Sequence, residues 1–481
     1  MLELNDLSCF GSHDKLKHIG HMIMPTIMKF GGTSVADANA LENVAQIVAS
    51  RVPSVPAVVV SAMSGVTDAL LNSTVIASGA RCDDAISSLN KTFERYLATA
   101  EQILSRDAAS AYAKYVNSAQ DQIAYFLKLI DSQLAQFQAV QDAVLAFGET
   151  LSSLLLANLL TERGVPAIHL DARECIITDD NHSAASPLMS ETTEATRSRV
   201  LSILDTGTVP VLGGFIGSNL KGQTTTLGRG GSDYTAAILG AALSAREIQI
   251  WTDVTGVLTA DPRVVPQAQT VERLSYGEAA ELAYFGAKVL HPKTIQPAIE
   301  DCIPVRICNS RAPEETGTLV CAQTETTPRT VKAIAHKTGV TTVQITSARM
   351  LGAYGFLRAL FEVFETHRTV VDVVTTSEVS VSLSLDDASS LPAIVADLEH
   401  LGTVRVEKGR AIICVVGEGL QGTPGIAARV FSTISDINVT LISQGASSIN
   451  FTFAIEEEKV KEAVTRLHEA FFEEKAAGIS A

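Results

Sequence analysis

Short apolar runs rich in Val and Ile alternate with longer helical patterns from residue 27 onward. Helical spacing of apolar residues occurs at 36–50 and in a long stretch from about 87 to 160. The β-rich runs are TIMKF, PAVVVSA, PAIHLDA, VPVLGGF, EIQIWTDV and IPVRICN. This alternation predicts an α/β fold with a mostly parallel sheet covered by helices on both faces. Ligands of such sheets bind beyond the carboxyl ends of the strands, so the residues after each run are the candidates for function.

A weak internal repeat follows a polar, proline-containing stretch, AQTETTPRT, which we interpret as a linker. One copy begins at Gly355 and the other at Gly425, and each predicts helix, strand, turn, strand. The second copy ends in a helix without its final strand, and the spare run 331–336 could supply it. We therefore expect an N-terminal extension over 1–27, an α/β domain over 28–322 and a region with the two repeats over 323–481. Its two repeats would cover about 340–410 and 411–475.

Composition narrows the class of protein. With 481 residues, of which 46% are hydrophobic, the chain predicts two to four domains with a large core. A net charge of −16 argues against nucleic acid or an anionic membrane as the main partner. We find no apolar run of ~18 residues and expect no membrane span. Residues 1–27 are polar and His-rich and lack a signal-peptide core. The seven cysteines include no C-x-x-C pair, which favours reduced thiols and a cytoplasmic location.

The stretch TTTLGRGGSDYTAAILGAAL, 224–243, places Arg229, Ser232 and Asp233 in a glycine bend before a helix. Glycine N–H groups and a helix N-terminus favour an anion, whereas Asp233 adds negative charge there. The bend therefore suits a ligand that carries both signs, such as an amino acid next to a phosphate. The alternative is a strand-to-helix turn with Ser232 as N-cap and an exposed Arg–Asp ion pair.

The first two strand ends also carry polar groups. Lys29 precedes Gly31 and Gly32, and a lysine beside exposed N–H groups is a phosphate cradle in physical terms, although no Walker A loop occurs. The alternative is a glycine turn with a solvated lysine. Ser61 follows the second strand and Thr67 lies near the next helix start, where capping alone is the commoner role.

Three later segments complete the candidates. In LAFGETLSS, Glu149 is by default a solvated glutamate at a helix start. Thr252 and Asp253 follow the strand that ends in Trp251, where they would hold a ribose, a base or a Mg²⁺-bound phosphate, or make a turn. Ser275 and Glu278 form a capping box that starts a helix, near whose end Lys288 lies.

Together these segments carry a family resemblance. KFGGTSV, GRGGSDYTAA, WTDV, DPR and FGAKVLHP occur in this order and resemble aspartate kinase (aspartokinase) of the amino acid kinase superfamily, most of all its monofunctional lysine-sensitive type. The likeness extends from Lys29 to about Phe472, and the repeat resembles the family's tandem ACT domains. The resemblance implies that 28–322 is a catalytic domain with the amino acid kinase fold and that 323–481 is a regulatory region with two ACT domains of βαββαβ type.

The resemblance assigns roles to the candidate residues. The catalytic positions are Lys29, Asp233 and Lys288. Arg229 would hold the α-carboxylate of L-aspartate and Glu149 its ammonium, with further substrate contacts from Ser61, Thr67 and Ser232. Nucleotide contacts fall on Lys29, Gly31, Gly32, Thr252, Asp253, Leu258, Arg263, Lys288 and Val289. Leu258 replaces a tyrosine of the family, which puts one contact near the nucleotide in question.

The implied reaction transfers the γ-phosphoryl group of ATP, bound with Mg²⁺, to the side-chain carboxylate of aspartate. That nucleophile is ionised at neutral pH, because its reference pKa is about 4, so no general base is needed. The site itself supplies no cluster of metal ligands. Two alternatives stay open: a kinase acting on glutamate or N-acetylglutamate, or an amino-acid sensor with an inactive kinase domain.

The resemblance also implies feedback inhibition by L-lysine. A buried ammonium needs acidic or carbonyl partners, and the first repeat offers Asp372 and Glu378 around VVTTS, which the second repeat lacks. The alternatives are that both acids are solvated, or that threonine is the effector. The implied lysine site comprises Met350, Ala353, Phe356, Leu357, Val371, Asp372, Thr376, Ser377 and Glu378. Ala353 replaces a serine of the family. We expect a homodimer or homotetramer formed through the ACT domains.

Overall fold

The computed structural model describes residues 24–132, 136–286, 290, 292–322, 330–352, 354–445 and 447–473. The chain divides into two compact units. The first comprises residues up to 256 together with 291–323, and the second comprises 257–290 together with 324 onward. Residues 257–290 thus pack with the C-terminal unit, whereas the sequence analysis placed them in the catalytic domain. The expected extension over 1–27 lies almost wholly outside the described residues.

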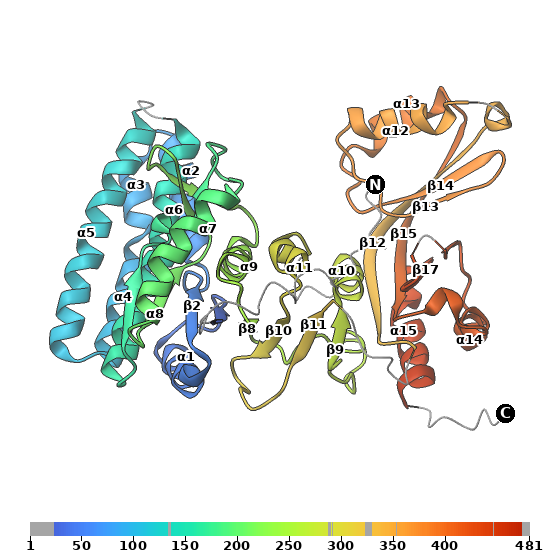
Figure 1. Ribbon diagram of the computed structural model, residues 1–481. Helices are drawn as coiled ribbons and strands as arrows, with labels where there is room; N and C mark the ends of the chain where they lie inside the picture. Colours follow the sequence, from blue (N-terminus) through green and yellow to red (C-terminus); the bar gives the residue numbers. More distant parts are fainter. Residues whose placement is uncertain are drawn as a thin grey trace. The chain divides into compact units, whose positions relative to one another are not determined.

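The first unit is built on a sheet with the strand order β3-β5-β2-β1-β8-β10-β11 (Figure 1). All neighbours pair in parallel except β10 and β11. The six β-rich runs of the sequence all form strands of this sheet, which confirms the predicted α/β fold. The bounds are β1 Thr26–Phe30, β2 Pro56–Val60, β3 Ala167–Leu170, β5 Val209–Gly213, β8 Glu247–Thr252, β10 Val305–Asn309 and β11 Thr318–Cys321.

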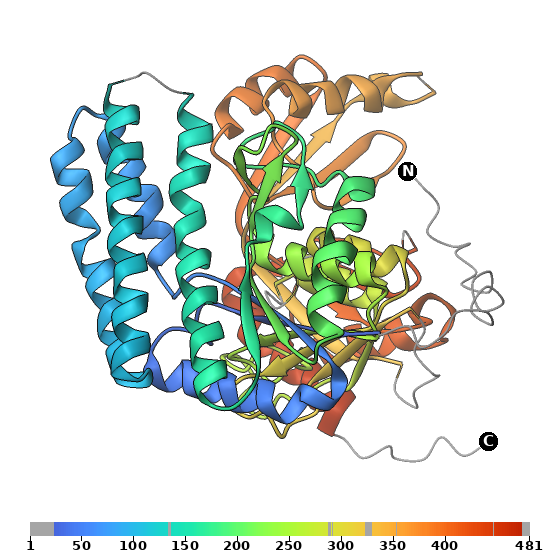
Figure 2. The same cartoon turned by 60° about the vertical axis from the view of Figure 1, so that its left-hand side comes forward.

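A small second sheet, β4-β6-β7, and a set of helices complete this unit. The long helices α4, α5 and α6 contact one another and lie side by side in Figure 2. The small sheet consists of β4 Ile177–Thr178, β6 Ile216–Asn219 and β7 Thr224–Thr226. The helices are α1 Ala38–Arg51, α2 Val66–Ser78, α3 Cys82–Ser88, α4 Asn90–Ile103, α5 Arg106–Asp131, α6 Phe137–Glu162, α7 Met189–Thr196, α8 Ser202–Leu204, α9 Gly231–Leu243 and α11 Gln296–Glu300.

The two faces of the sheet have different partners. Met28 and Phe30 of β1 belong to a core cluster that includes apolar residues of α1 and α6. Successive side chains of a strand point to opposite faces, so Lys29 lies on the other face, where α9 contacts β1, β2 and β8. The strand pattern alone therefore directs Lys29 towards α9.

Helix α6 is long and apolar enough to cross a membrane, judged by length and composition only. In its most apolar window 78% of the residues are buried inside the protein, as expected for a core helix. The sequence contains no continuous apolar run of this length, because polar residues that include buried Asp142 and Glu149 interrupt the apolar ones without breaking the helix.

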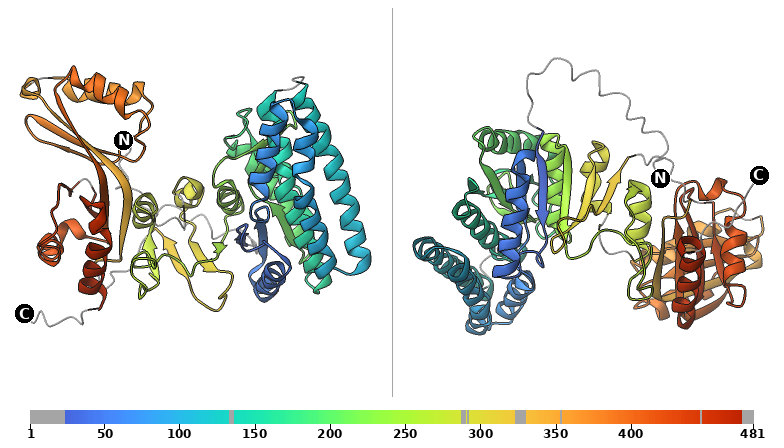
Figure 3. Two further views of the ribbon diagram at one scale, coloured as in Figure 1. Left: turned by 180° about the vertical axis from the view of Figure 1, so that it is seen from behind. Right: turned by 90° about the horizontal axis from the view of Figure 1, so that it is seen from below.

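The second unit carries a sheet with the order β13-β14-β12-β15-β17-β16. Each repeat forms the predicted helix, strand, turn, strand, and its helix begins after a glycine N-cap with φ of 83° at Gly355 or 84° at Gly425. Helices α12 and α13 contact each other, as Figures 1 and 3 show. The elements are β9 Arg273–Ser275, α10 Tyr276–Tyr284, β12 Ala333–Thr346, α12 Phe356–Thr366, β13 Val374–Thr376, β14 Ser380–Leu385, α13 Leu391–Glu399, β15 Thr403–Val416, α14 Ile426–Thr433, β16 Leu441–Ser443, β17 Asn450–Glu456 and α15 Val460–His468.

Two 14-residue strands, β12 and β15, run through both repeats and pair antiparallel. The first half of β12 pairs with the second half of β15, from Ala333 opposite Val416 to Lys337 opposite Ile412. The second half of β12 pairs with β14 in the first repeat. Residues 333–337 thus form an edge of the second repeat's part of the sheet, at the place where the sequence analysis put the missing strand.

Candidate active site

The loops after β1, β2, β5 and β8 are joined by backbone hydrogen bonds just beyond the ends of the strands. Gly31 N donates to Trp251 O over 3.1 Å, Ser61 N donates to Phe30 O over 3.0 Å, and Gly214 N donates to Val60 O over 2.8 Å. Neighbouring loops therefore leave the sheet edge in contact with one another. This edge is where ligands of parallel sheets bind.

Glycines allow the close approach of these loops. A Cβ atom on Gly32 would lie 2.8 Å from the carbonyl oxygen of Ala62. A Cβ atom on Gly214 would lie 2.6 Å from the Cβ atom of Ser232. The glycines therefore set the contact between the β1 and β2 loops and bring Ser232 of α9 against the end of β5.

Lys29 and Asp233 form an ion pair across this edge. Lys29 Nζ lies 2.6 Å from Asp233 Oδ1, and the two side chains are 11% and 20% exposed. Helix α9 begins after Gly230, whose φ is 74°, and it has no side-chain N-cap. The bend is thus a strand-to-helix turn, but the expected Ser232 N-cap and the expected Arg229–Asp233 ion pair were wrong, because Gly230 is the N-cap and Asp233 pairs with Lys29.

Arg229 occupies the bend between Gly228 and Gly230, both of which have a φ of 74°. Its side chain is exposed and forms no hydrogen bond or ion pair with the described part of the chain. The position of its guanidinium group thus depends on the backbone of the bend. The group remains available to an anion from outside.

Glu149 lies in the interior of α6 and is only 3% exposed, so its interpretation as a solvated residue was wrong. Burial raises the pKa of Glu149 to about 8, although hydrogen bonds from the backbone N–H groups of Ala62 and Glu149 act in the opposite direction. Its Oε2 atom accepts no hydrogen bond within the described part of the chain. A buried carboxylate oxygen without a donor is a ready partner for an ammonium group.

The remaining candidates of the first unit lie at the same edge. Ser61 follows β2 directly, and Thr67 lies in the first turn of α2, which starts after Gly65 without a side-chain cap. The capping role was therefore wrong for this helix. Thr252 ends β8, and its hydroxyl donates to Asp253 Oδ1 over 3.2 Å. Asp253 itself is exposed.

Comparison with known proteins decides the family. The Amino acid kinase family matches residues 24–309, and an ACT domain matches residues 413–471. Lysine-sensitive aspartokinase 3 of Escherichia coli (strain K12) is 38% identical over 460 residues, which cover 93% of this chain and 99% of the relative. The chain belongs to the aspartokinases of the amino acid kinase family.

Solved aspartokinase structures share the fold. E. coli aspartokinase III in complex with aspartate and ADP has a TM-score of 0.76 at 36% identity, covering 93% of this chain and 100% of that one. The same protein in complex with lysine and aspartate has a TM-score of 0.79 at 37% identity, covering 93% and 99%. The sequence-based assignment to this family and fold is confirmed.

Some expected nucleotide-site residues of this aspartokinase belong to the second unit. Leu258 forms an isolated β-bridge with Thr270. Arg263 is highly exposed and pairs with Asp261, with Nη2 and Oδ2 2.6 Å apart. The predicted capping box of Ser275 and Glu278 is present at the start of α10. Lys288 and Val289 lie outside the described residues.

The expected effector residues of this aspartokinase lie around β13 and α12. Burial, followed by the neighbouring Asp386, raises the pKa of Asp372 to about 8. Asp372 also accepts a hydrogen bond from Tyr284 of α10, and Lys337 pairs with Asp386. Glu378 is exposed. Ala353 lies outside the described residues; the other members are partly or fully exposed, namely Met350, Phe356, Leu357, Val371, Thr376 and Ser377.

Several residues that organise the site carry no sequence signal. Arg95 of α4 donates to Ser64 O over 2.8 Å and to Ala36 O over 2.5 Å, so it connects the loops after β1 and β2. Tyr96 donates to Gly148 O over 2.9 Å and supports the helix next to Glu149. Arg95 and Tyr96 lie in a helix with many polar residues, far in sequence from any glycine motif, so their partners become visible only in the folded structure.

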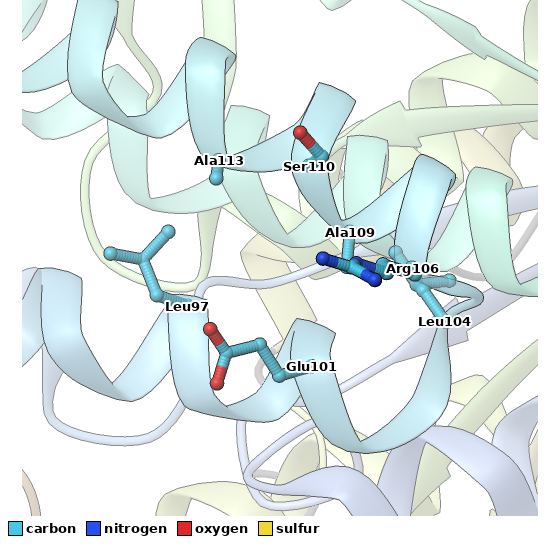
Figure 4. A pocket seen from close by; sticks show the side chains of 7 residues that line it. All are labelled: Leu97, Glu101, Leu104, Arg106, Ala109, Ser110 and Ala113. Carbon is cyan, nitrogen blue, oxygen red and sulfur yellow. The ribbon is translucent and has the colours of Figure 1, made fainter.

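One surface hollow of this aspartokinase lies elsewhere (Figure 4). It is lined by residues of α4, α5 and the turn between them: Leu97, Glu101, Leu104, Arg106, Ala109, Ser110 and Ala113. None of these residues belongs to the sheet edge described above. The hollow is therefore a groove between packed helices and not part of the candidate site.

The raised pKa of Glu149 predicts a pH-dependent stability. The unfolded state ionises near the ordinary pKa of 4.5, whereas the folded state keeps its proton up to about pH 8. The folded state therefore binds more protons between these values, and stability falls as the pH rises through this window. Glu149→Gln should remove this loss of stability. The free energy of unfolding of the variant minus that of wild type, measured with urea, should therefore increase by about 1.4 kcal/mol per pH unit between about pH 5 and 8. Exposed Glu94→Gln is the control and should show no such trend.

Proposed function

We propose that the chain phosphorylates the side-chain carboxylate of L-aspartate with ATP, giving 4-phospho-L-aspartate and ADP. The observation that carries this proposal is the combination, at one sheet edge, of a Lys29–Asp233 ion pair, a buried Glu149 oxygen and an exposed Arg229, the last two without a hydrogen-bond partner among the described residues. The E. coli relative has been solved with aspartate and ADP, which supports the same pair of ligands here.

Charge complementarity explains the choice of substrate. Arg229 pairs with the α-carboxylate and Glu149 with the α-ammonium, while Ser61, Thr67 and Ser232 supply hydroxyl groups around the ligand. Ionised Glu149 in this buried position needs a cation, and an acetylated amine has none to offer. N-acetylglutamate is therefore a poor substrate on physical grounds.

Phosphoryl transfer requires charge neutralisation between two anions rather than a base. Lys29 would contact the moving phosphoryl group, and Asp233 holds its ammonium in place through the 2.6 Å ion pair. The family resemblance assigns nucleotide contacts to Gly31, Gly32, Thr252 and Asp253 of the first unit and to Leu258 and Arg263 of the second. It also assigns them to Lys288 and Val289, which lie outside the described residues. The carboxylate of Asp253 is exposed and free to approach ATP-bound Mg²⁺, which shields phosphate charge.

A panel of acceptors tests the proposal directly. Coupled ADP release should be fast with L-aspartate and about a hundredfold lower in kcat/KM with L-glutamate, whose extra methylene moves the reacting carboxylate relative to the fixed α-groups. It should be lower still with N-acetyl-L-glutamate, which also lacks the ammonium group. Preference for glutamate or N-acetylglutamate would support the related kinases instead. Absence of turnover with all three would support an amino-acid sensor.

Lys29→Ala tests the catalytic assignment. Removing one charge aimed at the transition state should lower kcat by roughly 100- to 1000-fold, with smaller changes in KM, because the ion contributes most as the phosphoryl group moves. Lys91→Ala, on the exposed face of α4, is the control for loss of a surface lysine. A Lys29→Ala enzyme with a nearly normal kcat would contradict the catalytic role.

Feedback inhibition by L-lysine belongs to the same proposal. Asp372 and Glu378 flank β13 and would receive the two ammonium groups, while the loop before α12 would receive the carboxylate. The Oδ2 atom of Asp372 accepts no hydrogen bond in the described part of the chain, which leaves an acceptor for a cation. The solved E. coli complex with lysine and aspartate supports this effector. Ala353, which lies outside the described residues, lacks the hydroxyl group of the family's serine.

Glu378→Ala tests the effector site. The variant should keep its basal kcat and lose inhibition by lysine, with the half-inhibitory concentration raised by about tenfold or more, because one ammonium group loses its charged partner. Exposed Glu399→Ala, at the end of α13, provides the control and should remain inhibited. Inhibition by threonine but not lysine, or undiminished lysine inhibition of Glu378→Ala, would contradict the assignment.

Assembly and location complete the proposal. Large apolar side chains are exposed on the C-terminal unit, among them Leu351, Tyr354, Val370 and Ile442, with exposed fractions from 48% to 104%. Exposed apolar side chains on this unit support a contact with a second copy. The enzyme is thus a homodimer or homotetramer formed through its ACT domains, and it acts in the cytoplasm without nucleic-acid or membrane partners.

A further inference from the structure

A second buried carboxylate lies on α6, outside the residues assigned to the reaction. Asp142 is fully buried and accepts hydrogen bonds from three residues. Thr226 Oγ1 donates to Oδ1 over 2.6 Å, Ser183 N donates to Oδ2 over 2.9 Å, and His182 Nδ1 lies 2.9 Å from Oδ2. Since a carboxylate only accepts, the His182 ring donates from Nδ1. The His182 side chain is itself only 4% exposed.

These contacts join three segments that are distant in the sequence. Asp142 belongs to α6, His182 and Ser183 belong to the loop after β4, and Thr226 ends β7. Ser183 has a φ of 69°, a left-handed conformation that costs energy for a non-glycine residue. The two hydrogen bonds from this loop to Asp142 hold that conformation in place.

The same segments support the bend that carries Arg229. Ala185 N donates to Thr226 O over 2.9 Å, directly before the bend. A Cβ atom on Gly228 would lie 3.2 Å from Ser183 O, so the bend rests against the strained loop. The backbone at 226–228 is thereby held by groups that Asp142 organises. As the Arg229 side chain has no partner of its own in the described part of the chain, its position follows from that backbone.

Helix α6 also carries Glu149, seven residues after Asp142. Seven residues are about two helical turns, so both side chains lie on one face of the helix. One rigid element therefore positions Glu149 directly and the Arg229 bend through Asp142. An amino acid that must reach both groups at once requires their separation to be fixed.

We propose that Asp142, Thr226 and His182 form a positioning cluster that keeps Arg229 in register with Glu149 for binding of the amino-acid substrate. This inference rests on the proposed function, in which Arg229 binds the substrate carboxylate. An apolar side chain in place of Asp142 would avoid the cost of a buried carboxylate. Apolar packing is not directional, whereas the hydrogen bonds of the cluster are, and they fix the geometry of the bend.

Thr226→Val tests the cluster with little change of shape. It removes one hydrogen bond to a charged group, so KM for aspartate should rise by about tenfold or more while KM for ATP stays within about twofold. Thr225→Val is a matched control, because the adjacent hydroxyl contacts Thr178 Oγ1 over 2.7 Å instead of Asp142. The control should keep both KM values. Asp142→Asn, which retains the size of the side chain, should raise KM for aspartate in the same way.

A double-mutant cycle separates positioning from general destabilisation. If the cluster acts through Arg229, Thr226→Val should add no further increase in KM for aspartate in the Arg229→Ala background. Additive effects, equal effects of Thr225→Val, or an unchanged KM in an active Thr226→Val enzyme would overturn the inference alone. A wild-type enzyme that does not accept aspartate would instead overturn the proposed function, and the inference with it.

Discussion

Parallel pairing of β1 with its two neighbours continues for one residue beyond the strands, and the site depends on that continuation. Gly31 N and Ser61 N each donate to a carbonyl at a neighbouring strand end, Trp251 O and Phe30 O. These bonds hold the turns so close together that Gly32 has no room for a side chain against Ala62. Lysine, serine and threonine side chains from distant parts of the sequence therefore lie close together, because the turns that carry them are held against one another.

The three ionisable side chains Lys29, Arg229 and Glu149 each avoid the cost of a buried, unpaired charge in a different way. Lys29 is largely buried and is paired with Asp233, which offsets the cost of removing its ammonium from water. Arg229 is exposed and needs no partner, whereas buried Glu149 avoids the cost by keeping its proton, since burial raises its pKa to about 8. A cationic Arg229 and a protonated Glu149 thus lack internal partners for their outer atoms in the described part of the chain, whereas Lys29 is already held by Asp233.

The sequence predicted the helices and strands better than the burial and the partners of individual side chains. The spacing of apolar residues located the strands and the repeat, because this spacing is a local property of the chain. The order of the motifs identified the family. The environment of Glu149 was missed because its burial comes from packing against a strand end at Gly213, and the partner of Asp233 is distant along the chain. Residues 257–290 were assigned to the catalytic domain from their motifs, whereas their packing with β12 is a property of the fold.

The packing of residues 257–290 against the ACT repeats provides a physical connection between the proposed effector site and the kinase sequence. Residues 257–290 belong to the part of the chain matched by the kinase family, yet they form one compact unit with the ACT repeats. Thr259 accepts a backbone hydrogen bond from Ile334 N of β12, and its hydroxyl lies 2.8 Å from His468 Nε2 of α15. Tyr284 at the end of α10 donates to Asp372, the residue proposed to receive the effector. In the proposed lysine site, an ammonium group would bind Oδ2 of the carboxylate whose Oδ1 accepts from Tyr284, so binding of the effector would act on the helix that directly precedes the motif FGAKVLHP.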